Sequence, residues 1–217
     1  NFISDHSIPI ILILSCCAAA VILVLFFLLR NSMRVQKLMY KDTEFNIWNL
    51  HYLRYRAAKK LAADKNSNYA IAYTDIGQFK DYNALYGWDA GQRILELVIK
   101  ALSEEVDDER ELYARSYGCH FVLFMKYENV ETLRKRLMDI ADRVSSRIYE
   151  KTETHMSLVM GVGCLENGND DLQRALSEGI QLVESLKNSY DNEVQIYDDK
   201  LRAQLRETHE REKLLES

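Results

Sequence analysis

The most pronounced hydrophobic pattern in the chain is an unbroken apolar run near its N-terminus. Residues 8–29 carry no charged side chain over 22 positions. A helix that crosses the hydrocarbon core of a bilayer needs roughly 20 predominantly apolar residues. The run therefore predicts one transmembrane helix at residues 8–29, preceded by an extracytoplasmic stub at residues 1–7.

The charges on either side of this run indicate its orientation. Four basic residues follow the run with no acidic residue before Asp42, whereas Asp5 and His6 are the charged or titratable side chains before it. Because positive charge accumulates on the cytoplasmic side of a span, we expect a single-pass protein of the plasma (inner) membrane with its C-terminal part in the cytoplasm. A signal peptide would have the opposite order, with its positive charges before the apolar run. The four basic residues are Arg30, Arg34, Lys37 and Lys41.

The segment after the apolar run is charged and compatible with a helix. We therefore expect residues 30–44 to continue the membrane helix inward as a cytoplasmic signalling linker. Since the chain begins with Asn1 instead of Met, we also expect it to be a fragment of a longer protein.

Beyond the linker, short apolar segments alternate with longer segments of helical periodicity. The apolar segments resemble buried strands, and the longer ones have one apolar face each. Two of the strands flank a tight turn that contains Gly118, so a hairpin interrupts the alternation. The pattern predicts an α/β (α+β) fold, a mixed sheet of about five strands flanked by helices. The predicted strands are 69–75, 111–115, 121–126, 157–164 and 194–197, and the predicted helices are 48–63, 94–102, 130–148 and 172–186.

The last part of the chain, residues 199–217, is highly charged and has few apolar positions. Opposite charges four residues apart, such as Glu207 and Arg211, favour a helix. We expect this segment to leave the domain as a helical linker.

Composition limits the classes of partner and of metal site. The net charge of −5 makes nucleic acid an unlikely partner, because nucleic-acid binding requires basic surface. Two of the four cysteines, Cys16 and Cys17, lie in the apolar run, and the other two, Cys119 and Cys164, do not have the spacing of a metal site. Reduced thiols are expected in a cytosolic domain.

Residues 74–92 read T-D-I-G-Q-F-K-D-Y-N-A-L-Y-G-W-D-A-G-Q, and this motif resembles the first signature of the GGDEF (diguanylate cyclase) family, D-I-D-x-F-K-x-I-N-D-x-x-G-H-x-x-G-D. Further segments at 42–49, 157–162 and 186–197 are similar to other parts of that family, so that the resemblance covers residues 42–198. It implies a nucleotidyl-cyclase-like fold for a domain at residues 45–198. The matching positions in the motif are Asp75, Ile76, Phe79, Lys80, Asn83, Gly87 and Gly91.

The resemblance also implies where the chemistry of this family takes place. Two carboxylates hold Mg²⁺ against the triphosphate of GTP, because Mg²⁺ prefers hard oxygen ligands and neutralises charge on the transferring phosphoryl group. Asp75 and the backbone of Ile76 match the first metal position, but Cys119 stands at the second. A thiol is a poor ligand for Mg²⁺. We therefore expect weak or absent Mg²⁺ binding.

The hairpin motif itself is degenerate. Tyr117 replaces a glycine that leaves room beside the nucleotide, and His120 replaces the next acid. No catalytic residue of the motif is therefore expected to be intact, and little or no cyclase activity is predicted. We do not expect Cys119 and His120 to form a joint metal or thiol–imidazole site, because adjacent residues in a strand or tight hairpin point to opposite faces. The five positions of the motif are Tyr117, Gly118, Cys119, His120 and Phe121.

The nucleotide-binding positions implied by the resemblance are only partly changed. Asn83 matches the residue that reads guanine, and Gln92 replaces its acidic partner but keeps an acceptor oxygen. Lys187 matches a lysine that contacts phosphate, whereas Asp191 reverses the charge of an arginine that does so. Phe79 and Lys80 complete the candidate nucleotide-binding residues.

These expectations combine into one functional hypothesis. The chain is expected to be a membrane-anchored, catalytically inactive GGDEF domain that acts as a homodimer in cyclic di-GMP signalling. It would relay a transmembrane signal, bind GTP, and control a downstream EAL phosphodiesterase domain through residues 199–217. Two alternatives stay open: a divergent but active diguanylate cyclase that makes cyclic di-GMP from two GTP, and a purely structural dimerisation module.

Overall fold

The computed structural model describes residues 2–106, 110–165, 171–186 and 189–197, with the backbone alone for residues 2–13, 34, 37 and 38. Two predictions lie outside these residues: the phosphate-binding role of Lys187 and the linker helix at residues 199–217. The described elements follow the predicted order of helices and strands, with one additional helix at residues 79–86 that the sequence analysis did not predict.

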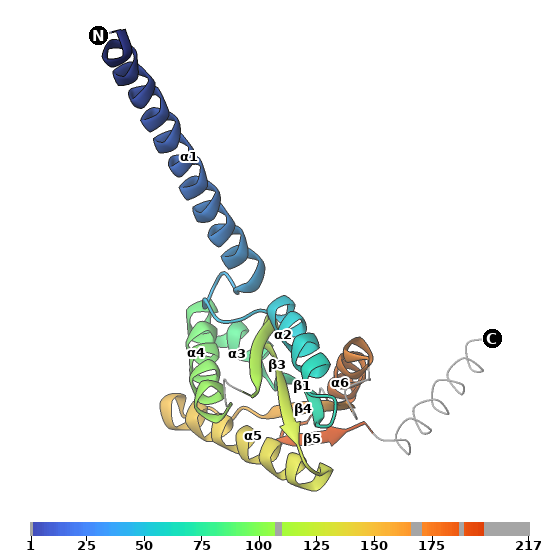
Figure 1. The fold of residues 1–217 in the computed structure, drawn as a ribbon. Helices are drawn as coiled ribbons and strands as arrows, with labels where there is room; N and C mark the ends of the chain where they lie inside the picture. The colour runs from blue at the N-terminus through green and yellow to red at the C-terminus, as the bar shows by residue number, and fades with distance from the viewer. Residues whose placement is uncertain (1, 107–109, 166–170, 187–188, 198–217) are drawn as a thin grey trace, which may run out of the picture.

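The N-terminal helix α1 (Phe2–Tyr40) extends away from the rest of the fold (Figure 1). Its segment Leu14–Met33 is long and apolar enough to cross a membrane, and none of it is buried against the protein. The prediction that the helix continues to residue 44 is wrong, since α1 ends at Tyr40. The Asp42 carboxylate accepts hydrogen bonds from the backbone N–H groups of Glu44 and Phe45. These bonds form a tight turn, so the helix does not continue.

Aromatic side chains join the end of α1 to the next helix, α2 (Leu50–Ala63). The Tyr40 ring stacks on His51 with 5.6 Å between the ring centroids and also contacts Tyr52. Asn49 caps α2 through its side chain, which accepts from the Tyr52 N–H at 3.0 Å. The C-terminal end of α1 is therefore packed on the domain.

A single five-stranded mixed sheet forms the centre of the domain, as the sequence predicts. Its strand order is β2-β3-β1-β4-β5, with antiparallel neighbours except for the parallel pair β4 and β5. The order places β1 in the middle, where both of its edges are paired. The strands are β1 (Asn68–Ile76), β2 (Leu112–Tyr117), β3 (His120–Tyr127), β4 (Leu158–Leu165) and β5 (Glu193–Ile196).

Helices cover both faces of this sheet (Figure 1). The helices α4 (Trp88–Glu105) and α5 (Val130–Thr152) pack on one face, and α2 and α6 (Leu172–Leu186) pack on the other. The β1 side chains alternate between these two cores because successive residues of a strand point to opposite faces. Ala70 and Ala72 face the α4–α5 core, whereas Ile71 and Tyr73 face the α2–α6 core.

A short helix, α3 (Phe79–Tyr86), follows β1 directly and leads into α4. Gly87 lies between the two helices with φ +82°, a backbone conformation that glycine adopts without strain. This sharp connection places α3 and the start of α4 beside the end of β1 and the β2–β3 turn.

Candidate functional site

The candidate site lies where the C-terminal end of β1 meets the β2–β3 turn. The pairing of β1 with β3 sets this arrangement, with Thr74 opposite Phe121. Asp75 and Ile76 are the last two residues of β1, so that they stand beside the turn that contains Cys119. The predicted metal positions are therefore neighbours in space.

Three potential metal ligands converge on this point. The Cys119 thiol donates to Asp75 Oδ1 at 3.1 Å, and His120 Nδ1 lies 3.4 Å from the same oxygen. One ligand atom from each residue lies within 4.8 Å of the others. The Asp75 and His120 side chains are 13% and 16% exposed, so the cluster is mostly enclosed.

This geometry corrects the prediction that Cys119 and His120 point to opposite faces. Alternation holds only inside a strand, and β3 begins at His120. Cys119 lies in the turn, after Gly118, whose φ of +53° is in the left-handed region. The turn rotates Cys119 back toward β1, and both side chains reach Asp75.

The environment of Cys119 keeps its thiol neutral. Burial raises the pKa of the Cys119 thiol to about 12, and the negative charge of Asp75 adds to the effect. At neutral pH the site therefore holds one carboxylate and a protonated thiol that donates to it.

These donors do not fit the Mg²⁺ ion that GGDEF cyclase domains use. Mg²⁺ requires near-octahedral oxygen coordination at about 2.0–2.1 Å. Asp75 is the carboxylate of the cluster, and the other two side chains offer sulfur and nitrogen. Neither Cys119 nor His120 supplies the negatively charged oxygen that a phosphate-bound Mg²⁺ ion prefers as a ligand.

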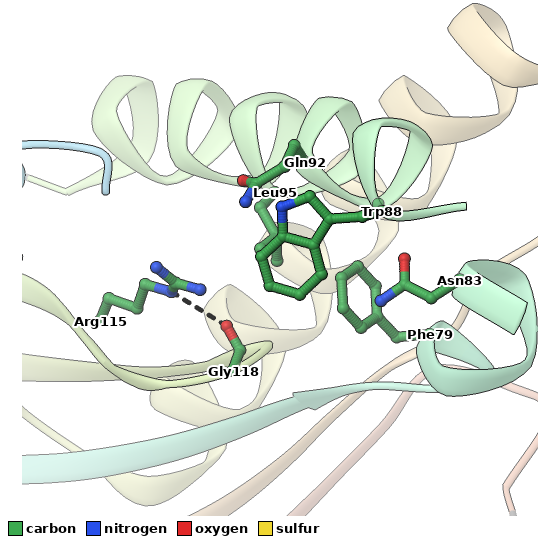
Figure 2. A pocket seen from close by; sticks show the side chains of 8 residues that line it. Phe79, Asn83, Trp88, Gln92, Leu95, Arg115 and Gly118 are labelled. Atoms are coloured by element: carbon green, nitrogen blue, oxygen red, sulfur yellow. Dashed lines mark hydrogen bonds between the residues drawn. The ribbon is translucent and has the colours of Figure 1, made fainter. Parts of the chain in front are cut away.

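Beside this cluster lies a small cavity between α3, α4 and the β2–β3 turn (Figure 2). Its volume is about 40 Å³, far below the roughly 300–1,000 Å³ of typical ligand pockets. The predicted residues Phe79, Asn83 and Gln92 all contribute to it. The lining residues are Phe79, Asn83, Trp88, Gly91, Gln92, Leu95, Arg115 and Gly118.

Asn83 lines this cavity, and its Oδ1 atom lies against the backbone of Gly91 at the start of α4. Its Oδ1 atom is buried and accepts no hydrogen bond from the described residues. A buried acceptor without a donor costs about 1–3 kcal/mol. Gln92 is less available, because its Nε2 donates to the Glu44 carboxylate.

Other candidate residues lie apart from the cavity. Lys80 is exposed in the first turn of α3 and does not contribute to the lining. Tyr117 is 65% exposed and does not line the cavity. Its ring meets the His120 ring edge-on, with 4.7 Å between the ring centroids. Trp88, which the sequence analysis did not single out, lines the cavity instead, next to Phe79 (Figure 2).

Arg115 is a second residue that sequence analysis overlooked. It is 5% exposed on β2, its Nε donates to the Gly118 carbonyl at 2.9 Å, and its guanidinium pairs with Asp42 at 3.2 Å and with Glu44. Its backbone N–H donates to Trp48 O at 3.0 Å. Arg115 thus ties the segment after α1 to the turn that carries Cys119. A basic residue in a strand pattern was the available signal, but its partners are about 70 positions away.

Comparison with known proteins agrees with this fold. The family model described as "Diguanylate cyclase, GGDEF domain" matches residues 40–193. A diguanylate cyclase from Vibrio cholerae is 25% identical over 143 residues, which are 66% of this chain and 44% of that protein. The chain therefore spans less than half of the length of that relative.

Solved structures show the same fold at low identity. The coiled coil and GGDEF domain of DgcB from Caulobacter crescentus, in complex with c-di-GMP, superposes with a TM-score of 0.71 at 18% identity, covering 85% of this chain and 99% of that one. The active GGEEF domain of a diguanylate cyclase from Vibrio cholerae has a TM-score of 0.62 at 22% identity, covering 70% and 97%.

Proposed function

Because the chain belongs to the GGDEF diguanylate cyclase family, we propose that it is a catalytically inactive, regulatory member that relays a signal from a membrane helix to a degenerate nucleotide site. The observation that carries the proposal is the hydrogen bond from the Cys119 thiol to Asp75 at 3.1 Å. A proton donor faces the metal-binding carboxylate where the family resemblance implies a second carboxylate.

Inactivity follows from the charge at this site. Cyclisation depends on a divalent cation that neutralises charge on the triphosphate, and here Asp75 would have to hold that cation without a second acid. Each 1.4 kcal/mol of lost transition-state stabilisation lowers the rate tenfold. Asp191, exposed before β5, carries negative charge where a phosphate-binding cation is expected, so it increases the repulsion.

The relay follows from the contacts of Arg115. A movement of α1 would reach the turn of residues 42–45 first, since this turn directly follows the helix. The pairs of Arg115 with Asp42 and Glu44 connect that turn to Gly118 in the β2–β3 turn. A signal can be relayed in this way only if α1 adopts two positions and the contacts of Arg115 differ between them.

GTP is the proposed ligand of the cavity. Asn83 and Gln92 both line the cavity, and their side-chain amides are suited to pair with the N–H and carbonyl groups of guanine. The cavity of about 40 Å³ is far smaller than a typical ligand pocket, so we expect the Trp88 indole to move when GTP enters. Binding is accordingly expected to be weak.

The wider context of the proposal comes from the family resemblance and the apolar helix. Leu14–Met33 would cross the plasma (inner) membrane once and leave the domain in the cytoplasm. Two copies would pair as a homodimer, and residues 199–217 would pass the conformational bias to a downstream EAL phosphodiesterase domain. The regulatory GGDEF domain and the EAL domain would act together in cyclic di-GMP signalling.

The first test is direct. We expect the full chain, in detergent at high concentration, to form no cyclic di-GMP from GTP with Mg²⁺ or Mn²⁺, because the site lacks the second acid. Chromatography would quantify the product, and the Asp75→Ala variant would define the background. Product from the unaltered chain that Asp75→Ala abolishes would make this a divergent cyclase. Circular dichroism would verify that both proteins are folded.

A second prediction concerns access to the cavity. Removing the indole by Trp88→Ala is expected to strengthen GTP binding at least about tenfold, or 1.4 kcal/mol, because it opens the space next to Asn83. Calorimetry without Mg²⁺ would measure this change, with ATP as the control nucleotide. An equal gain for ATP would contradict guanine recognition, and no binding of GTP to either protein would favour a purely structural dimerisation module.

A further inference from the structure

We infer that Asp75, Cys119 and His120 bind a Zn²⁺ ion, so that the family's magnesium position has become a site for a softer transition metal. This inference goes beyond the regulatory function proposed above and does not depend on it. It rests on the donor chemistry, the distances and the enclosure of the three side chains.

The donor set is one that zinc prefers. Zn²⁺ binds thiolate sulfur, imidazole nitrogen and carboxylate oxygen, and sites with three protein ligands keep a fourth position for water or another ligand. The cluster offers one donor of each kind. The same three groups suit Mg²⁺ poorly, because two of them are not oxygen.

The distances agree with tetrahedral coordination. With bonds of about 2.3 Å to sulfur and about 2.0 Å to nitrogen and oxygen, tetrahedral angles separate S from O by about 3.5 Å and N from O by about 3.3 Å. The observed separations from Asp75 Oδ1 are 3.1 Å for Cys119 Sγ and 3.4 Å for His120 Nδ1. Both separations from Asp75 Oδ1 are therefore within a few tenths of an ångström of the tetrahedral values, and the donor atoms of Cys119 and His120 lie within 4.8 Å of each other.

The surrounding structure holds the ligands in place. The His120 ring stacks on Tyr73 with 5.3 Å between centroids and meets the edge of Tyr117 at 4.7 Å. Asp75 is held by the pairing of central strand β1 with β4, where it lies opposite Val159. Ligands that are already positioned lose little conformational entropy on binding.

Metal binding would replace protons that the three groups now share. His120 Nδ1 lies between two acceptors, Asp75 Oδ1 at 3.4 Å and the Thr74 carbonyl at 3.2 Å, and is therefore placed to donate. As the Zn–S bond forms, the Cys119 thiol would release one proton to water, whereas His120 would bind the ion through Nδ1 as a neutral imidazole that carries its ring proton on Nε2. The ion would then occupy the space between Asp75 Oδ1, Cys119 Sγ and His120 Nδ1.

This cluster is distinctive within the part of the chain whose side chains are described. No other group of three His, Cys, Asp or Glu residues there has ligand atoms within 4.8 Å of one another. The remaining cytosolic cysteine of this part, Cys164, is on β4 and does not belong to the cluster. Cys164 is therefore a suitable control.

The test is a metal titration of the full chain in detergent, carrying Cys16→Ser and Cys17→Ser to remove the thiols of α1. We expect one Zn²⁺ per chain by calorimetry, not displaced by millimolar Mg²⁺. Co²⁺ in its place should produce the near-ultraviolet charge-transfer band of a thiolate–metal bond. Cys119→Ser should abolish this band and weaken Zn²⁺ binding at least about tenfold, whereas Cys164→Ser should change neither.

Two further variants keep the result interpretable. His120→Ala should weaken Zn²⁺ binding as Cys119→Ser does, while His155→Ala should not. Cys119→Asp should lose the cobalt band and keep the fold, which circular dichroism would verify. Absence of Zn²⁺ binding, or binding unaffected by Cys119→Ser and His120→Ala, would overturn the inference. No nucleotide is present in this titration, so its failure would leave the cyclase assay and the proposed function untouched.

Discussion

Replacement of Arg115 by methionine is expected to lower the free energy of unfolding by about 3 kcal/mol. The change removes a buried cation and leaves Asp42 and Glu44 without their partner. Breaking a buried ion pair costs about 3–5 kcal/mol, and the lower end applies because the two carboxylates keep contact with water. The Gly118 carbonyl also loses the donor at 2.9 Å. Urea unfolding of the full chain in detergent, followed by circular dichroism, would measure the change.

An exposed arginine provides the matched control. Arg143 pairs with Glu105 on the surface, with its side chain 61% exposed. Arg143→Met should therefore cost less than about 1 kcal/mol. If Arg115→Met cost no more than this control, the contacts of Arg115 would not hold the turn after α1 to the β2–β3 turn, and the proposed relay would lose its structural basis.

Substitution of Gly161 by alanine is the second change with a large expected effect. Gly161 lies in β4, where the backbone of α6 approaches so closely that a Cβ atom would stand 2.1 Å from the Gly179 carbonyl oxygen. The strand and the helix would have to separate, which should cost about 3 kcal/mol, at the upper end of the range for overpacking. Thermal and urea unfolding would both report it, as a lower Tm and a lower urea midpoint.

Gly118 is the appropriate comparison for this prediction. A Cβ atom at Gly118 would meet nothing within 4 Å, so alanine there suffers only the strain of φ +53°, about 1 kcal/mol. Comparable losses for the two variants would show that contact between β4 and α6 does not require glycine. If Gly161→Ala loses more stability than Gly118→Ala, the close approach of β4 and α6 accounts for the difference.

The degenerate turn has a chemical consequence beyond the loss of a ligand. Cys119 does not simply leave a gap beside Asp75, because its thiol donates to that carboxylate. Where the family resemblance implies ligands for a hard cation, the structure places sulfur and imidazole donors beside Asp75. The proposed inactivity and the inferred Zn²⁺ site both follow from these substitutions, although they are tested by separate measurements.

Much of the fold was accessible from the sequence. Apolar runs and helical periodicity are local properties, and they predicted the element order, the mixed sheet and the apolar N-terminal helix. The GGDEF resemblance rested on motifs of consecutive residues, and the family model match bears it out. The replaced acids at Cys119 and His120 were likewise readable position by position.

The contacts of the site were not accessible in this way. Asp75 and Cys119 are 44 positions apart, and only the register of β1 on β3, with Thr74 opposite Phe121, brings them together. The left-handed backbone at Gly118 then decides that Cys119 and His120 share a side. Alternation along a strand predicted the opposite, because it does not extend into a turn.

The sequence by itself predicted most of the helices and strands, although not α3, and it carried the resemblance to the GGDEF motif with its replaced acids. The tertiary structure alone decided that Arg115 joins the segment after α1 to the site and that Trp88 lines a cavity beside it. The physical reason is the range of the interactions: propensity and periodicity act over a few residues, whereas pairing, burial and ligand geometry depend on groups that only the folded chain brings together.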